Sequence, residues 1–72
     1  VVVLDVKMPG IDGIDLTKRI KDLYPEIRII LLTGRGSKEE SLKGLNEGAS
    51  DYLVKPIDIE TLIEKMEKAR ES

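Results

Sequence analysis

The sequence has 72 residues, of which 40% are hydrophobic and 36% charged, a balance typical of one small globular domain rather than a disordered chain. It contains no cysteine and no histidine, which excludes disulfide bridges, thiolate metal sites and histidine general bases. The net charge of -2 argues against a nucleic-acid-binding surface, and no apolar run approaches the ~20 residues of a membrane span, so we expect a cytoplasmic setting away from membranes.

The first six residues form an apolar run that contains a single carboxylate, Asp5. A continuous run of branched apolar residues is typical of a strand buried on both faces of a parallel sheet. An unpaired charge is costly inside such a strand, so Asp5 is expected at its carboxyl end. Ligands bind at that edge of open α/β sheets. Asp5 is therefore the candidate chemical centre, and a Pro9-Gly10 loop is expected to follow it.

A first helix is predicted over residues 13–24, capped by Asp12 and ended by Pro25. Apolar residues at helical spacing predict its inward face: Leu16, Ile20 and Leu23. Polar residues between them are expected on the exposed face: Thr17, Lys18, Lys21 and Asp22.

A second apolar strand is predicted over residues 27–32, ending in Thr33, with a glycine loop at 34–36. The next helix is expected to begin with a capping box formed by Ser37 and Glu40, to turn Leu42 and Leu45 inward and to stop at Gly48.

A third strand is predicted over residues 51–54, directly before Lys55-Pro56. Asp58 is expected to cap a last helix whose tail, residues 67–72, is polar and frays. Its apolar residues at helical spacing are Ile59, Leu62, Ile63 and Met66. Strands that alternate with helices predict an α/β fold, here a three-stranded parallel sheet with three helices.

Three side chains with different chemistry stand at the strand ends: Asp5, Thr33 and Lys55. The carboxyl ends of parallel strands share one edge of a sheet, so these side chains can converge. A carboxylate is ionised near neutral pH and can act as a nucleophile. A hydroxyl and an ammonium can bind phosphoryl oxygens, whose charge also calls for a cation such as Mg²⁺. The three residues together predict a phosphoryl site.

With Lys55-Pro56 included, the chain resembles the receiver domain of two-component response regulators. The motifs that carry the resemblance are Leu4-Asp5, Met8-Pro9, Asp12-Gly13, Leu32-Thr33-Gly34, Gly48-Ala49, Asp51-Tyr52 and Lys55-Pro56. The resemblance implies the C-terminal part of a flavodoxin-like, doubly wound fold, from its third strand onward. Residues 1–72 would then be a partial receiver domain that lacks the family's first two β-α units.

The resemblance also implies roles for single residues. Asp5 would be the phosphoacceptor and Lys55 its partner, while Thr33 would bind the phosphoryl group and Tyr52 would turn inward as Thr33 moves. The backbone carbonyl of Lys7 would bind Mg²⁺ beside Asp5. The acidic pair that completes this metal site in the family is absent here, so Mg²⁺ binding by this chain alone is expected to be weak. The Lys55-Pro56 bond would be cis.

The partner that the resemblance implies is a sensor histidine kinase or a phosphotransfer protein, and the chain would signal rather than act as an enzyme. Its output surface would involve residues 38–48, Tyr52 and residues 58–66. Two alternatives stay open. A truncated receiver fragment would no longer signal but would self-associate through its exposed first strand, or bind a chain that supplies the missing half. A haloacid dehalogenase-like phosphatase also uses Asp, Thr and Lys, but needs a second Asp where Lys7 stands.

Each candidate residue also has a purely structural interpretation. Asp5 could cap a loop, Thr33 could bond the backbone of 34–36, and Tyr52 could be an ordinary core aromatic. Lys55 could lie on the surface. Four further aspartates are expected to serve only as caps or solvated charges: Asp12, Asp15, Asp51 and Asp58. Arg35 is expected to be solvated rather than bound to phosphate.

Overall fold

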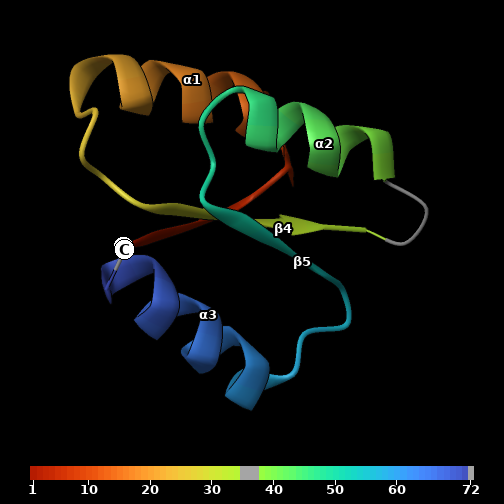
Figure 1. Ribbon diagram of the computed structural model, residues 1–72. Helices are drawn as coiled ribbons and strands as arrows, with labels where there is room; N and C mark the ends of the chain where they lie inside the picture. The colour runs from red at the N-terminus through yellow and green to blue at the C-terminus, as the bar shows by residue number, and fades with distance from the viewer. Residues whose placement is uncertain (35–37, 72) are drawn as a thin grey trace.

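The structure is a computed structural model that describes residues 1–34 and 38–71. Within them, a three-stranded parallel sheet forms the middle layer, with strand order β1-β4-β5 (Figure 1). Its strands are β1 (Val2–Asp5), β4 (Ile29–Thr33) and β5 (Asp51–Val54). The described helices are α1 (Gly13–Leu23), α2 (Lys38–Asn46) and α3 (Ile59–Glu71). This arrangement confirms the predicted fold class.

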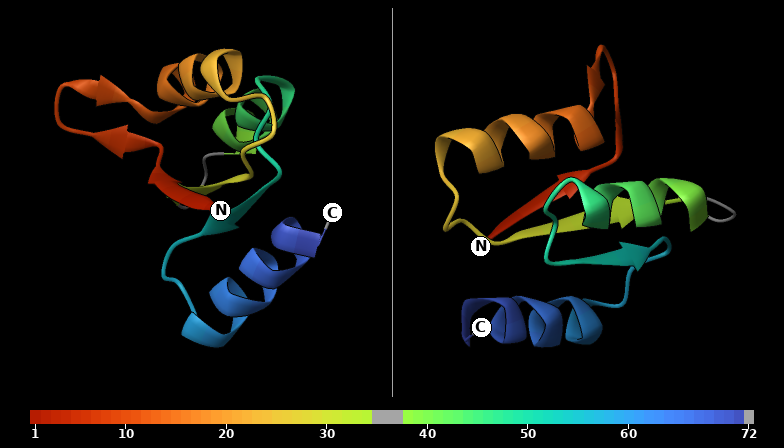
Figure 2. Two further views of the ribbon diagram at one scale, coloured as in Figure 1. Left: turned by 90° about the vertical axis from the view of Figure 1, so that its left-hand side faces the viewer. Right: turned by 45° about the horizontal axis from the view of Figure 1, so that its top comes forward.

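Helices cover both faces of the sheet: α1 and α2 lie on one side and α3 on the other (Figures 1 and 2). The central strand β4 is buried on both faces, and Ile29, Ile30 and Leu31 have no exposed surface. Two core clusters result, one on each side of the sheet. The α1/α2-side cluster is Val6, Ile14, Ile29, Leu31 and Ala49. The α3-side cluster is Ile30, Leu53 and Ala69.

The segment after β1 is more regular than the expected loop. Its residues form a short antiparallel ribbon of β2 (Lys7–Met8) and β3 (Ile11–Asp12), which projects beyond the sheet at the start of α1 (Figure 2). Gly10 adopts a positive φ of 72° at the turn, a conformation that glycine reaches without the steric cost of a side chain. The ribbon fixes the backbone that leaves Asp5.

Asp12 caps α1 as predicted, since its carboxylate accepts a hydrogen bond from the Ile14 N–H at 2.9 Å. The predicted inward face is only partly confirmed: Ile20 packs on the α1/α2-side cluster, but two other residues are placed differently from the prediction. Thr17 is fully buried, and its hydroxyl donates to the Gly13 carbonyl at 2.8 Å, whereas Leu23 is 73% exposed. The helix begins with Gly13 pressed against β1, and this contact turns Thr17 rather than Leu23 toward the sheet.

Lys21 was expected on the exposed face but is half-buried. Its ammonium donates to the carbonyls of Pro25 and Ile27 at 2.7 and 2.9 Å. Its aliphatic stem lies against Gly48, as expected for a long side chain that buries its methylenes. Lys21 therefore ties the end of α1 to the loop before β4.

The predicted stop after α2 is confirmed by Gly48, which has a positive φ of 114°. Leu45 packs on the α1/α2-side cluster as predicted, but Leu42 is 51% exposed, so its inward assignment was wrong. The buried positions are Ser41 and Gly44, because α2 lies so close to the sheet that a Cβ on Gly44 would sit 2.2 Å from Leu31 Cδ1. The capping residue Ser37 and most of the predicted 34–36 loop, including Arg35, lie outside the described residues.

The last helix begins after Asp58, whose carboxylate accepts a hydrogen bond from the Thr61 hydroxyl at 2.9 Å. Of the four apolar residues at helical spacing, Leu62 and Met66 pack against the α3-side cluster, whereas Ile59 and Ile63 are exposed. The predicted fraying was wrong as far as Glu71, because buried Ala69 anchors the last turns of α3 on the core.

Two acidic residues expected to be solvated take part in ion pairs. Asp51 accepts from Lys65 at 2.7 Å, which links β5 to α3, and the exposed Asp15 lies 3.6 Å from Arg19. Across the described part of the chain, no helix has both the length and the apolar character needed to cross a membrane.

Candidate functional site

The carboxyl ends of the three parallel strands bring the predicted site residues to one edge of the sheet. Asp5 lies opposite Leu32 in the pairing of β1 with β4, and Thr33 lies opposite Val54 in the pairing of β4 with β5. Asp5, Thr33 and Lys55 therefore occupy neighbouring strand ends. The sheet register alone accounts for this placement, because consecutive parallel strands end on the same side.

Asp5 is held by two donors. Its Oδ2 forms an ion pair with Lys55 Nζ, and its Oδ1 accepts a hydrogen bond from the Lys7 backbone N–H at 3.0 Å. The Lys55 hydrogen bond is the largest influence that lowers the pKa of Asp5 below its usual value. The Lys7 N–H and the charge of Lys55 act in the same direction, while desolvation opposes them. Asp5 is thus an anion at neutral pH, the form that acts as a nucleophile.

Both partners of this ion pair remain accessible: the Asp5 side chain is 31% exposed and that of Lys55 45% exposed. The backbone fixes Lys55 through a hydrogen bond from its N–H to the Thr33 carbonyl at 2.7 Å. The Lys55-Pro56 peptide bond is cis, as the resemblance implied. The pair can therefore meet a ligand from solvent while its lysine stays anchored to β4.

Thr33 is only 1% exposed, and its hydroxyl has partners on β5 and α2. The hydroxyl donates to the Leu53 carbonyl at 3.4 Å and accepts from the Ser41 hydroxyl at 3.4 Å. The structure therefore brings Asp5 and Lys55 into direct contact but engages the Thr33 hydroxyl elsewhere. Ser41 was missed from the sequence; the one available signal was its three-residue spacing from Gly44, which marks a face of small residues on the helix.

Tyr52 lies opposite Leu31 in the β4–β5 pairing and is half-buried. Its ring packs against the α1/α2-side cluster, the same side of the sheet that α2 covers. This packing agrees with the structural interpretation of Tyr52 as a core aromatic. Tyr52 is on β5, which pairs directly with β4, the strand that carries Thr33.

The donors that could hold Mg²⁺ are the Asp5 carboxylate and the Lys7 carbonyl. Both carboxylate oxygens of Asp5 are already engaged, by Lys55 and by the Lys7 N–H. Within residues 1–34 and 38–71, no group of three or more acidic, histidine or cysteine side chains could hold a metal ion. Mg²⁺ demands near-ideal octahedral coordination by oxygen. The described residues therefore offer Mg²⁺ the Asp5 carboxylate and the Lys7 carbonyl, and the rest of its octahedral shell would have to come from water, phosphoryl oxygens or further ligands.

The chain is similar to known signalling proteins. Residues 1–67 match the sequence model of a protein family, the response regulator receiver domain. The transcriptional regulatory protein TctD of Salmonella typhimurium (strain SL1344) is 43% identical over 60 residues, which cover 83% of this chain and 27% of TctD. This chain thus spans about a quarter of that relative.

Two solved receiver domains have the same fold. The receiver domain of NtrX from Brucella abortus superposes with a TM-score of 0.93 at 31% identity, and the BeF3-activated receiver domain of DrrB with 0.89 at 39% identity. Each superposition covers 99% of this chain and 62% of the solved chain.

Proposed function

The chain belongs to the response regulator receiver domain family of two-component signalling, and we propose that Asp5 is its phosphoacceptor. The observation that carries the proposal is the accessible, anionic Asp5 held between Lys55 and the Lys7 N–H at the end of β1. Receiver domains interact with sensor kinases or phosphotransfer proteins, and are generally not catalytic enzymes. Because the chain belongs to the receiver family, we prefer a phosphoacceptor to the haloacid dehalogenase-like alternative.

The proposed step is a phosphoryl transfer from a phosphohistidine of the partner. An Asp5 carboxylate oxygen attacks phosphorus and forms an O–P bond, while the donor N–P bond breaks and its electron pair stays on the imidazole nitrogen. Lys55 offsets the added negative charge, since its ammonium already contacts the attacking carboxylate. The cytoplasmic setting expected from the sequence stays a prediction.

We further propose that Thr33 and Tyr52 transmit the effect of Asp5 phosphorylation to the rest of the domain. The Thr33 hydroxyl would leave Leu53 and bind the new phosphoryl group, and the Tyr52 ring would move into the vacated space. Both hydrogen bonds of Thr33 are 3.4 Å long, close to the limit for such contacts, so a shorter, charge-assisted bond to a phosphoryl oxygen can replace them. The ligand shifts the population toward a packing that it binds better. The surface that responds would include α2 and the start of α3.

Beryllofluoride binding tests this proposal directly, because one relative is described as a BeF3-activated receiver domain. With magnesium present, the wild-type chain should give a bound fluorine NMR signal that is lost in Asp5→Asn. Asp15→Asn, which removes an exposed carboxylate on α1, should keep the signal. A wild-type chain without a bound signal, or an Asp5→Asn chain that retains one, would contradict the proposal.

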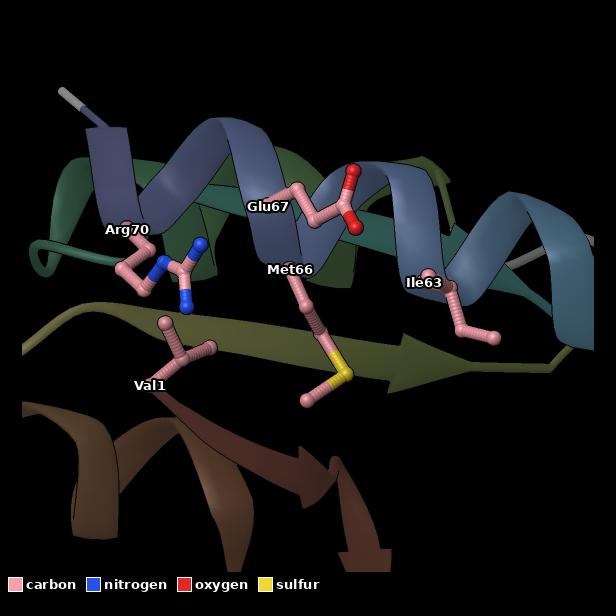
Figure 3. A pocket seen from close by; sticks show the side chains of 5 residues that line it. All are labelled: Val1, Ile63, Met66, Glu67 and Arg70. Carbon is pink, nitrogen blue, oxygen red and sulfur yellow. The ribbon is translucent and has the colours of Figure 1, made fainter.

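A second candidate function is self-association through β1. β1 is an edge strand of the sheet, and a hollow of about 310 Å³ lies beside it. The hollow is lined by Val1, Ile63, Met66, Glu67 and Arg70. Figure 3 shows Met66 and Arg70 extending from α3 toward Val1. An open apolar edge of this kind invites pairing with another strand.

We propose a second copy of this chain as the occupant, in a two-fold contact that joins the β1 strands antiparallel. A two-fold contact places the same surface of both subunits together. Glu67 and Arg70 carry opposite charges on this surface, so each can meet its complement on the other copy. A separate chain supplying the family's first two β-α units would compete for the same edge.

A further inference from the structure

Two buried hydroxyls connect α2 to the sheet beside the site. Ser41 on α2 is 2% exposed and Thr33 is 1% exposed. The Ser41 hydroxyl donates to Thr33 Oγ1, and Thr33 Oγ1 donates to the Leu53 carbonyl, each at 3.4 Å. Buried hydroxyls need hydrogen-bond partners because water cannot reach them. The three groups form a relay from α2 through β4 to β5.

The close approach of α2 to the sheet places Ser41 in this relay. Gly44, three residues further along the same helix face, leaves no room for a Cβ beside Leu31. Only a small side chain fits between a helix and a sheet at this separation. A serine there brings its hydroxyl against Thr33, whereas the longer Leu42 points to solvent. The close approach of the α2 backbone to the sheet thus determines where the Ser41 hydroxyl lies.

We propose that Ser41 is a positioning residue for Thr33. By donating to Thr33 Oγ1, Ser41 favours the rotamer in which Thr33 gives its proton to the Leu53 carbonyl and is not free to bind a group on Asp5. The signalling consequence rests on the proposed function. When Thr33 turns to a phosphoryl group on Asp5, Ser41 loses this acceptor, and the hydrogen bonding of α2 changes with it. Ser41 thus couples the site to α2.

The rotamer of Thr33 can be measured without any phosphoryl ligand. Three-bond NMR couplings to the Thr33 methyl carbon should show one χ1 rotamer in the wild-type chain and averaging over several rotamers in Ser41→Ala. Leu42→Ala, an exposed change at the next position of α2, should leave the couplings unchanged. Averaged couplings in the wild type, which need no variant to fold, would overturn the proposal, and so would a fixed rotamer in Ser41→Ala.

A double-mutant cycle separates this role from simple packing. Ser41→Ala should lower the urea midpoint of unfolding more in the wild-type background than in Thr33→Val, which lacks the hydroxyl. Equal effects in both backgrounds would show that Ser41 does not act through Thr33, and would overturn the proposal.

Beryllofluoride titration then tests the link to signalling. Releasing Thr33 from one neutral hydrogen bond should tighten beryllofluoride binding roughly two- to tenfold in Ser41→Ala. Unchanged or weaker binding would contradict the coupling. If Ser41→Ala frees the Thr33 rotamer and neither chain binds beryllofluoride, the positioning role is supported while the phosphoacceptor proposal fails.

Discussion

At the scale of single residues, the site depends on the pairing of Asp5 with Lys55. Both side chains are partly exposed, and exposed ion pairs contribute little to folding stability. Their pairing acts instead on protonation and orientation, because Lys55 and the Lys7 N–H both stabilise the anionic form of Asp5. A carboxylate that remains charged and directed toward the strand-end edge is what a phosphoacceptor requires.

Lys55→Gln should raise the pKa of Asp5 toward its usual value, because the largest stabilising partner of the anion is removed. A carboxyl group with a lowered folded-state pKa stabilises the fold above its unfolded-state pKa, and this contribution is lost as the pH falls through the folded-state pKa. The acid-dependent loss of stability should therefore be smaller in Lys55→Gln. Carbon-detected NMR titration of the Asp5 carboxyl measures the change.

The control for this titration is Lys65→Gln, which removes the lysine paired with Asp51. Asp51 begins β5, at the opposite end of the strand from Lys55. Lys65→Gln should leave the Asp5 titration unchanged. If the Asp5 midpoint is the same in Lys55→Gln as in the wild type, then Lys55 does not set the charge state of the site.

At the scale of secondary-structure elements, close backbone contacts position the site more than large apolar side chains do. The start of α1 is pressed against the end of β1: the Gly13 N–H donates to the Val6 carbonyl at 2.9 Å, and a Cβ on Gly13 would lie 2.4 Å from the Asp5 carbonyl oxygen. This contact explains in physical terms why a glycine follows the capping Asp12. It also fixes the backbone that carries the Asp5 side chain.

Gly13→Ala should therefore destabilise the fold by about 1–3 kcal/mol, since the added methyl meets backbone atoms that cannot rotate away. This cost should exceed the gain of up to ~1 kcal/mol in helix propensity. Urea unfolding followed by circular dichroism measures it. Lys18→Ala, exposed on the same helix, should change stability by less than about 0.5 kcal/mol. A Gly13→Ala chain as stable as the wild type would refute the contact.

The sequence predicted the three strands of the parallel sheet and the three helices, but neither the β2–β3 ribbon nor which helix faces lie inward. Apolar spacing favours large residues, and so it selected Leu23 and Leu42, both of which are exposed. Apart from Ile14, the buried helix positions carry small or hydroxylic side chains: Gly13, Thr17, Ser41, Gly44 and Ala69. Their burial depends on how closely each helix approaches the sheet, and this distance is not encoded in the local pattern of any one helix.

The sequence likewise predicted part of the site. The contact between Asp5 and Lys55 could be predicted, because parallel strands end at one edge and both residues stand at strand ends. The orientation of the Thr33 hydroxyl could not, because it depends on Ser41, a partner on a separate element.

At the scale of the whole molecule, β1 combines two roles. It carries Asp5 at its end, and among the described residues no strand pairs with its side opposite β4. The Val2 N–H donates to the carbonyl of Arg28, the residue before β4, at 2.8 Å, and the Val6 N–H donates to the carbonyl of Leu32 in β4 at 2.9 Å. Because N–H groups alternate along a strand, that of Val3 points to the open edge. The strand that presents the acceptor is thus also the surface on which another chain can pair.

Self-association through this edge should be lost in Val3→Pro, which removes only an N–H on the open side, and in Met66→Lys, which places a charge in the hollow beside β1. Size-exclusion chromatography with light scattering should show a dimer for the wild type and monomers for both variants. Leu23→Lys, on an exposed site of α1, should remain dimeric. A monomeric wild-type chain, or dimers in both edge variants, would contradict this mode of association.

The most direct test of the central claim is to find where the chain accepts a phosphoryl group. The wild-type chain, Asp5→Asn and Asp15→Asn would each be incubated with acetyl phosphate and magnesium, and their intact masses measured. We expect one added phosphoryl group on the wild type and on Asp15→Asn, and none on Asp5→Asn. A wild-type chain that gains no mass, or an Asp5→Asn chain that gains as much as the wild type, would contradict the assignment of Asp5 as the phosphoacceptor.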